Sequence, residues 1–162
     1  MLTPEQEAFL STAAAAAVKS QIDTGCPAPL TLAQAIFESA WGSRIPQNNC
    51  FGIKCHAHGP VQYVLTHEFL NGEWKEMPLA FEAYATLADC FADHARLIQT
   101  GVYEVAWCGY RASPRDASDF DTYVRAVAKL YATDPGYSDK ILAEAHSATV
   151  QNAVLKAYTA AE

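Results

Sequence analysis

Hydrophobic residues recur at helical spacing over most of this chain and alternate with polar residues in one central stretch. At the N-terminus, Thr3 and Gln6 form a predicted capping box around Pro4, which suits the first position of a helix. The alanine-rich run 13–17 continues this helix with small side chains, so we expect another element to pack closely against it. Glycine and proline within residues 25–29 end the helix.

A second helix is expected to begin at a capping box of Thr31 and Gln34 and to end at Gly42. Its buried stripe is expected to consist of Leu32, Ala35, Ile36 and Ser39. Residues 43–60 follow as a polar, irregular stretch that is long enough to indicate a functional loop.

Strand-like alternation is confined to residues 61–69 and 73–84, which flank Asn71 and Gly72. An Asn-Gly pair between two such runs favours a two-residue hairpin turn. Pro78 inside the second run indicates an edge strand or a bulge, because proline cannot donate a ladder hydrogen bond.

Helical periodicity returns in the second half of the chain, first from Thr86 to Gly101. This helix is expected to turn Leu87, Phe91, His94, Leu97 and Ile98 inward. A loop is expected over 108–115, a helix over 118–131 and a turn over 133–136, with helices from there to the C-terminus. The sequence shows neither an internal repeat nor an interdomain linker, so it predicts one domain over residues 1–162. That domain is mostly α-helical with one β-hairpin, an α+β fold.

The composition agrees with one globular domain and excludes some partners. The chain has 162 residues, 51% hydrophobic and 18% charged, and roughly 150 residues are typical of one domain. Eleven basic and eighteen acidic residues give a net charge of −7, so we expect neither nucleic-acid nor membrane binding. We expect a monomer made in the cytoplasm without a signal peptide, since residues 1–7 lack a basic segment and an apolar core.

The odd number of cysteines leaves at least one thiol unpaired in a monomer: Cys26, Cys50, Cys55, Cys90 and Cys108. Reduced thiols in a cytoplasmic protein are one interpretation, and disulfides formed after export are another. In the second case, a turn at Gly52 could allow a local bridge between Cys50 and Cys55. Zinc is a third interpretation, based on these two cysteines with His56 and His58. The ligand spacing matches neither a zinc finger nor a ribbon, so we expect no metal.

Glu38 lies near the predicted end of the second helix, beside Trp41 and other large apolar residues. A carboxyl group next to an indole in a poorly hydrated cleft has its charged form disfavoured, so we expect its pKa to rise. Such a group can stay protonated near neutral pH and donate its proton to a leaving-group oxygen. The alternative is a helix-end glutamate that faces water.

Three motifs occur in order along the chain: LAQAIFESAWGS at 32–43, NNCFGIK at 48–54 and YATDPGY at 131–137. Together with residues 81–98, they resemble glycoside hydrolase family 73, the N-acetylglucosaminidases of bacterial autolysins and of the flagellar rod-cap muralytic enzyme. The resemblance covers about residues 5–145. It implies a lysozyme-like helical lobe and a small β-hairpin lobe flanking a substrate groove.

The resemblance also implies an endo-β-N-acetylglucosaminidase that cleaves the β-1,4 bond after N-acetylglucosamine in peptidoglycan glycan strands, without a cofactor. Glu38 matches the glutamate of the family's Glu-Ser-x-Trp-Gly motif and would be the general acid. Glu68, a few residues before the Asn-Gly turn, matches the second acidic residue and would activate water. Glu73 and Glu76 on the same hairpin are alternatives to Glu68, which could also be a solvated edge residue.

Four aromatic residues are candidates for stacking on sugar rings: Trp41, Phe51, Tyr131 and Tyr137. Packing in the core is the alternative for Trp41 and Phe51, whereas the resemblance puts the two tyrosines near the catalytic centre. Asn49 could bond an N-acetyl or hydroxyl group of the substrate, or it could order its own loop through backbone contacts.

Other function classes are open at the level of sequence. A catalytically silent peptidoglycan-binding or assembly module would use the same groove, as would a muramidase, but the presence of both Glu38 and Glu68 favours an enzyme. A cysteine peptidase based on Cys55 and His56 is disfavoured, because sequence neighbours rarely have that geometry.

The site of action is expected to be peptidoglycan in the periplasm or cell wall. Family members often carry a signal peptide and wall-binding repeats, and this sequence shows neither. One explanation is an exported antibacterial effector that acts on a target cell. Such a toxin would need an immunity protein as a partner in kin cells.

Overall fold

The computed structural model of the chain describes residues 1–56 and 59–161, with residues 68–70 described by their backbone alone. Its helices are α1 (Pro4–Thr24), α2 (Ala28–Glu38), α3 (Leu87–Leu97), α4 (Glu104–Ala112), α5 (Ala117–Tyr131), α6 (Tyr137–Ala145) and α7 (Ala148–Ala161). A 3₁₀ turn η1 (Pro46–Asn48) lies between α2 and β1, and η2 (Gly101–Tyr103) lies between α3 and α4. Strands β1 (Val61–Leu70) and β2 (Glu73–Glu82) pair antiparallel. The predicted α+β fold, mostly helical with one hairpin, is therefore confirmed. Among the described residues, no helix is long and apolar enough to cross a membrane.

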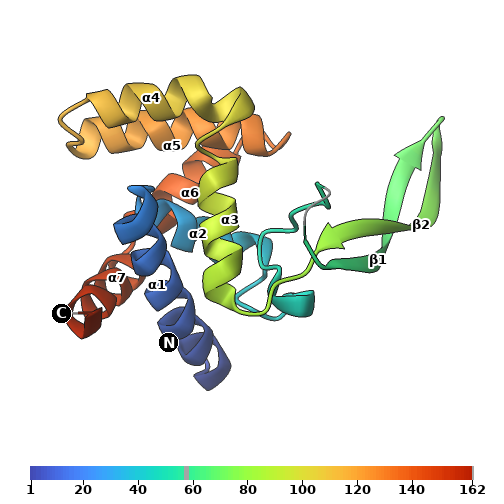
Figure 1. The fold of residues 1–162 in the computed structure, drawn as a ribbon, viewed down its shortest axis with the longest axis horizontal. Helices are drawn as coiled ribbons and strands as arrows, with labels where there is room; N and C mark the ends of the chain where they lie inside the picture. Colours follow the sequence, from blue (N-terminus) through green and yellow to red (C-terminus); the bar gives the residue numbers. More distant parts are fainter. Residues whose placement is uncertain (57–58, 162) are drawn as a thin grey trace.

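Helix α2 lies between two hydrophobic clusters in the middle of the helical body (Figure 1). One side of it contributes Leu32, Ala35 and Ile36 to a cluster that α1, α3 and α7 complete. Another side contributes Leu30 and Ala33 to a cluster built mainly from α4, α5 and α6. Burying a leucine or isoleucine side chain stabilises a fold by about 1.5–3 kcal/mol, so α2 is firmly held. Its last residue is consequently a rigid position at the edge of the body.

Helix α1 packs against α2, α3 and α7 through small side chains. Ala13, Ala14 and Ala17 are buried, which confirms the close packing expected of the alanine-rich run. The capping box of Thr3 and Gln6 is also present, with each side chain bonded to the other residue's backbone amide. Local sequence signals therefore determine where this helix begins.

The hairpin projects from the helical body as an arm (Figure 1). Asn71 and Gly72 at its tip have φ angles of 54° and 84°. Two successive left-handed residues are characteristic of a type I′ turn, so the predicted Asn-Gly hairpin is confirmed. Pro78 lies opposite Leu65 in this two-stranded sheet, where each strand has an unpaired edge that tolerates proline.

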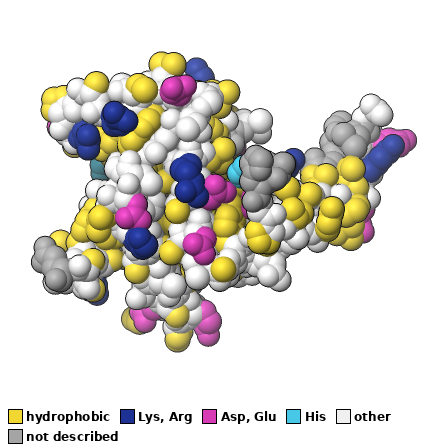
Figure 2. Space-filling model, viewed as in Figure 1, with side chains coloured by type: hydrophobic (Ala, Val, Ile, Leu, Met, Phe, Trp, Pro, Cys, Tyr) yellow, Lys and Arg dark blue, Asp and Glu magenta, His cyan; other side chains and the backbone are white. Residues whose placement is uncertain are grey.

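The loop before β1 holds the base of the arm. Lys54 forms a single β-bridge with Phe81, and the Cys55 amide donates to the Ala80 carbonyl across 3.0 Å. Further out, Tyr63 is 76% exposed, and Figure 2 shows hydrophobic side chains along the arm. The arm is thus fixed at its base and extends beyond the helical body over its outer part.

Two expectations about helix boundaries were wrong. Helix α2 begins at Ala28 with Pro27 as its N-cap, rather than at a capping box of Thr31 and Gln34. Thr31 lies fully buried inside the helix, and its hydroxyl donates to the carbonyl of Ala28. Proline is well suited to the first turn of a helix, which moves the start towards the N-terminus. At the other end, α2 stops at Glu38 instead of Gly42.

The loop expected over 108–115 was also wrong, because α4 continues to Ala112. Trp107 and Tyr110 of α4 pack against Tyr123 of α5, with the Tyr110 and Tyr123 rings stacked at 4.9 Å. These contacts stabilise a helix that Gly109 alone would disfavour. Leu97, the last residue of α3, is exposed rather than buried as expected, whereas Phe91 and His94 of this helix and its C-cap Ile98 are buried.

Candidate active site

Glu38 is the last residue of α2, immediately before a tight turn that redirects the chain. Ala40, Trp41 and Gly42 all have positive φ angles, of 48°, 58° and 79°. Gly42 lies so close to Phe9 of α1 that a side chain at this position would collide with the ring. The turn is therefore pressed against α1, which fixes the end of α2 and the direction of the Glu38 side chain.

Tyr137, the first residue of α6, holds the carboxyl group of Glu38. Its phenolic hydroxyl donates to Oε1 of Glu38 across 2.6 Å, and it accepts a longer hydrogen bond from Nε2 of Gln34 at 3.4 Å. Gln34 and Glu38 are four residues apart, so they lie on the same side of α2. Tyr131 at the end of α5 stacks on Tyr137, with ring centroids 6.0 Å apart and planes 5° apart. These four residues form the candidate catalytic cluster.

The environment of Glu38 favours the protonated acid. The residue as a whole is accessible to solvent, but partial burial of its carboxyl group raises the pKa, and the hydrogen bond from Tyr137 opposes that rise. The carbonyl end of a helix carries partial negative charge, which also disfavours a carboxylate there. The direction of the pKa shift expected from the sequence is confirmed. Glu38 can therefore retain a proton at a higher pH than an ordinary glutamate.

Asn49 is 3% exposed, and its amide group bonds the protein backbone. Nδ2 donates to the carbonyls of Ile53 and Glu82, both at 2.9 Å, while Oδ1 accepts from the Ile53 amide. Both amide protons are therefore used within the protein. These contacts favour the loop-ordering alternative for Asn49 over direct contact with a sugar.

Phe51 is an interior residue that contacts Tyr131 of the candidate catalytic cluster. It is 4% exposed and stacks on His94 of α3 with ring centroids 3.7 Å apart. Its backbone carbonyl accepts a hydrogen bond from the Tyr131 hydroxyl at 3.3 Å. Trp41 is half-buried against the same hydrophobic cluster as Phe51. These contacts favour core packing over sugar stacking for Phe51, whose carbonyl holds the Tyr131 hydroxyl.

Glu68, the second predicted catalytic residue, has its backbone in β1 opposite Lys75, and its side chain lies outside the described residues. Alternation puts Glu68 on the face of β1 that carries Val64 and Thr66, both of which are half-buried. Leu65 on the other face is 60% exposed. The described residues on that face are thus less exposed than Leu65, and the catalytic role of Glu68 stays a prediction.

The five cysteines lie in different parts of the fold. All five are free thiols, and the sulfur next to Cys50 belongs to Cys90 rather than Cys55. The Cys50–Cys55 bridge, which the sequence left as one possibility, is not present: Cys50 lies in the core, whereas Cys55 is half-buried at the hairpin base. His58, from the zinc interpretation, lies outside the described residues. Within the described ranges, no cluster of three His, Cys, Asp or Glu side chains could hold a metal ion.

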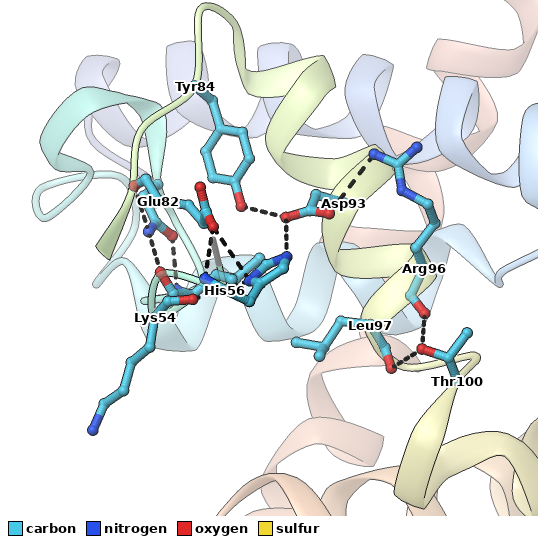
Figure 3. Close-up of polar contacts among 10 residues, drawn as sticks. Lys54, His56, Glu82, Tyr84, Asp93, Arg96, Leu97 and Thr100 are labelled. Atoms are coloured by element: carbon cyan, nitrogen blue, oxygen red, sulfur yellow. Dashed lines mark hydrogen bonds and ion pairs between the residues drawn. The ribbon is translucent and has the colours of Figure 1, made fainter. Parts of the chain in front are cut away.

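A second polar cluster, which sequence reasoning missed, ties the arm to the body (Figure 3). Oε1 of the buried Glu82 accepts from the His56 amide at 2.9 Å and lies 3.3 Å from that residue's ring Nδ1. The other ring nitrogen lies 3.6 Å from Asp93, which accepts a hydrogen bond from Tyr84 at 2.7 Å. The cluster joins the loop, the end of β2 and α3. His56 is 26 positions before Glu82 in the chain, so no local pattern predicts the cluster.

The fold and the Glu38 cluster together define the general class of the protein. A carboxyl group whose pKa is raised at the end of a buried helix, with a hairpin beside the helical lobe, is typical of a lysozyme-like glycoside hydrolase. Comparison with known families makes this specific: the chain belongs to the Glucosaminidase family, described as mannosyl-glycoprotein endo-beta-N-acetylglucosaminidase, which matches residues 14–149. The resemblance inferred from the three sequence motifs is therefore confirmed.

Individual relatives agree with this family. The chain is 38% identical over 125 residues to the autolysin of Enterococcus faecalis, covering 70% of the chain and 16% of the relative. It is 31% identical over 149 residues to peptidoglycan hydrolase FlgJ of Salmonella typhimurium, covering 86% of the chain and 45% of the relative. The chain thus spans less than half the length of these relatives. A C-terminally truncated glycoside hydrolase domain of the same FlgJ has a similar structure, with a TM-score of 0.66, 30% identity and coverage of 94% and 98%.

Proposed function

We propose that this chain is a single glycoside hydrolase domain that cleaves the β-1,4 bond after N-acetylglucosamine in peptidoglycan, with Glu38 as the general acid. The observation that carries the proposal is the 2.6 Å hydrogen bond from Tyr137 to Glu38 at the end of α2. Membership of the Glucosaminidase family and relatives named autolysin and peptidoglycan hydrolase support the substrate class.

In the proposed reaction, Glu38 donates its proton to the glycosidic oxygen as the bond to the sugar breaks. Burial raises the pKa of Glu38, which keeps a larger fraction of it protonated near neutral pH. Tyr137 binds Oε1, so Oε2 is the atom that would carry the catalytic proton. Because α2 is packed on two sides, the acid is positioned before substrate arrives.

The second carboxyl group in the proposal is that of Glu68, which would activate the attacking water. The arm that carries it is anchored at its base through Lys54 and Phe81, and a two-stranded ribbon is only marginally stable alone. We therefore propose that the arm bends about its base towards α2 when a glycan strand binds. In an inverting enzyme, the two carboxyl groups would then be about 6.5–9.5 Å apart.

Mass analysis of the fragments released from purified peptidoglycan tests this function. After borohydride reduction, the sugar at the new reducing end identifies the bond that was cut. Reduced N-acetylglucosamine is the expected product. Reduced N-acetylmuramic acid would make the chain a muramidase, and binding without fragments would make it a silent peptidoglycan-binding module.

The proposal extends to where the enzyme acts. A net charge of −7 gives the chain no electrostatic attraction to an anionic cell wall. This favours delivery to peptidoglycan in the periplasm of a target cell, as for an injected antibacterial effector with an immunity partner. Expression with a periplasmic signal sequence is expected to lyse Escherichia coli, whereas cytoplasmic expression is expected to be harmless. Lysis in neither case would contradict this part of the proposal.

A further inference from the structure

Two buried thiols lie side by side in the helical body, and the proposed catalysis uses neither of them. The Sγ atoms of Cys50 and Cys90 are 3.8 Å apart. Cys50 lies in the loop after η1, and Cys90 lies in α3, 40 residues further along the chain. Their exposed fractions are 1% and 0%. The pair therefore links a loop to a helix at a point that is closed to solvent.

We propose that Cys50 and Cys90 form a disulfide when the chain folds in an oxidising compartment. A disulfide bond is about 2.05 Å long, so the two sulfurs need to approach by less than about 2 Å, which small side-chain rotations can supply. The other cysteines have different surroundings. Cys26 is buried beside Tyr123 in the other cluster, Cys55 is half-buried at the hairpin base and Cys108 is exposed on α4. The geometry thus selects one pairing among five thiols.

The oxidation requires an external disulfide, such as oxidised glutathione or a thiol-disulfide oxidoreductase. One cysteine thiolate attacks the external disulfide, forms a mixed disulfide and displaces one reagent thiolate. The second cysteine thiolate then attacks the mixed disulfide, closes the Cys50–Cys90 bond and releases the other reagent thiol. The protein loses two protons and two electrons, and the reagent gains them as two thiols.

Burial determines when this reaction can occur. In the folded protein, desolvation raises the pKa of the Cys50 thiol strongly, and both sulfurs are shielded from reagents. A buried thiol is a poor nucleophile, so oxidation takes place during folding or local opening. For the same reason, the closed bond would be protected from reductants. Whether Cys50 and Cys90 are oxidised or reduced would therefore depend on the compartment in which the chain folded.

The disulfide would reduce the mobility of the loop that contacts the catalytic cluster. Cys50 precedes Phe51, whose carbonyl accepts the hydrogen bond from Tyr131, and Tyr131 stacks on Tyr137. A bond from Cys50 to α3 would hold this loop against the helix that carries His94, the stacking partner of Phe51. The inference concerns folding and stability, and it does not depend on the proposed catalytic activity.

Peptide mapping after refolding tests the pairing directly. The chain is unfolded, then refolded in a mixture of oxidised and reduced glutathione, alkylated and digested with trypsin. Cleavage after Lys54 separates Cys50 from Cys55, since these residues fall in peptides 45–54 and 55–75. A crosslink between peptides 45–54 and 76–96, which contains Cys90, is expected. A crosslink between 45–54 and 55–75, or no crosslink, would overturn the proposal.

Thermal unfolding supplies an independent readout and matched controls. Closing a loop of this length stabilises by constraining the unfolded chain, so the oxidised protein is expected to melt on the order of 10 °C above the reduced protein. Cys90→Ala is expected to abolish this difference, whereas Cys26→Ala, which removes a buried thiol from the other cluster, is expected to preserve it. Equal melting temperatures for the oxidised and reduced wild-type protein would contradict the proposal, whether or not either variant folds.

Discussion

The hydroxyl of Tyr137 donates a hydrogen bond to Oε1 of Glu38 across 2.6 Å, and it joins two residues that are 99 positions apart in the chain. Glu38 is the last residue of the buried helix α2, and Tyr137 is the first residue of α6, so the hydrogen bond connects these two helices. The hydrogen bond stabilises the carboxylate, while burial of the carboxyl group favours the acid and raises the pKa. The balance between these effects sets the pH range over which Glu38 keeps its proton.

Replacing Tyr137 with phenylalanine should move the alkaline limb of the pH–activity profile to higher pH. The variant loses the hydrogen bond that lowers the pKa of Glu38, so the acid holds its proton further into the alkaline range. The measurement is kcat/KM against pH on soluble peptidoglycan fragments. Tyr110→Phe on α4 is the control and should leave the limb in place. An unchanged or acid-shifted limb in Tyr137→Phe would separate this tyrosine from the catalytic acid.

Several features that depend on neighbouring residues could be predicted from the sequence, although the expected capping box of Thr31 and Gln34 was wrong. Thr3 with Gln6, Asn71 with Gly72, and the alanine-rich run each act within a few residues, where capping and turn chemistry decide the backbone. The loop expected over 108–115 failed because contacts with Tyr123 on the next helix stabilise α4. The hydrophobic periodicity of one segment cannot indicate contacts that it makes with another helix.

The candidate site shows the same division between local and distant signals. The direction of the Glu38 pKa shift followed from its apolar neighbours in sequence. The Tyr137 contact was suggested by the family resemblance alone, and the pairing of Cys50 with Cys90 was missed because no local pattern joins them. Gln34 was also missed as a member of the cluster, although its position one turn before Glu38 was a usable signal.

The assignment of Glu68 can be tested against its neighbours on the same hairpin. Glu68→Gln is expected to reduce turnover while glycan binding survives, because a water activator acts in the transition state. Glu76→Gln breaks only an exposed contact with His67 at 3.3 Å, and Glu73 is exposed near the tip. Both control variants should retain near wild-type lysis of purified cell walls. Loss of activity in either control together with a silent Glu68→Gln would reassign the second carboxyl group.

Asn49→Ala should destabilise the protein rather than weaken substrate binding. The substitution removes three hydrogen bonds and leaves the buried Ile53 amide without its acceptor, which costs about 2–3 kcal/mol of unfolding free energy, although the Ile53 and Glu82 carbonyls keep the Glu82 amide and Gln62 as donors. Urea unfolding measures the loss, with Asn152→Ala on the exposed side of α7 as the control. A raised KM with unchanged stability would instead make Asn49 a substrate contact.

Folding stability should fall as the pH decreases below about 6.5, because of His94. Complete burial lowers the pKa of His94 from 6.5 to about 3, and neither ring nitrogen has a hydrogen-bond partner among the described residues. Between these values the unfolded chain binds a proton that the folded chain does not, so this group removes about 1.4 kcal/mol of stability per pH unit.

Urea unfolding at pH 7 and pH 5 measures the effect of His94. His94→Leu should flatten the dependence of unfolding free energy on pH, whereas His67→Gln, on the exposed face of the arm, should retain it. A slope that is equal in the wild-type protein and in His94→Leu would show that the buried imidazole does not cause the acid sensitivity.

The role of Glu38 as general acid is tested most directly by comparing Glu38→Gln with the wild-type protein in the release of new reducing ends from purified peptidoglycan. Glutamine keeps the shape and can still accept the hydrogen bond from Tyr137, so circular dichroism and the melting temperature should change little. Glu104→Gln, an exposed residue of α4, controls for the loss of one carboxylate. The account predicts that Glu38→Gln loses about 10²–10⁴-fold in rate while Glu104→Gln is unaffected. A Glu38→Gln variant that retains more than about a tenth of the wild-type rate would contradict it.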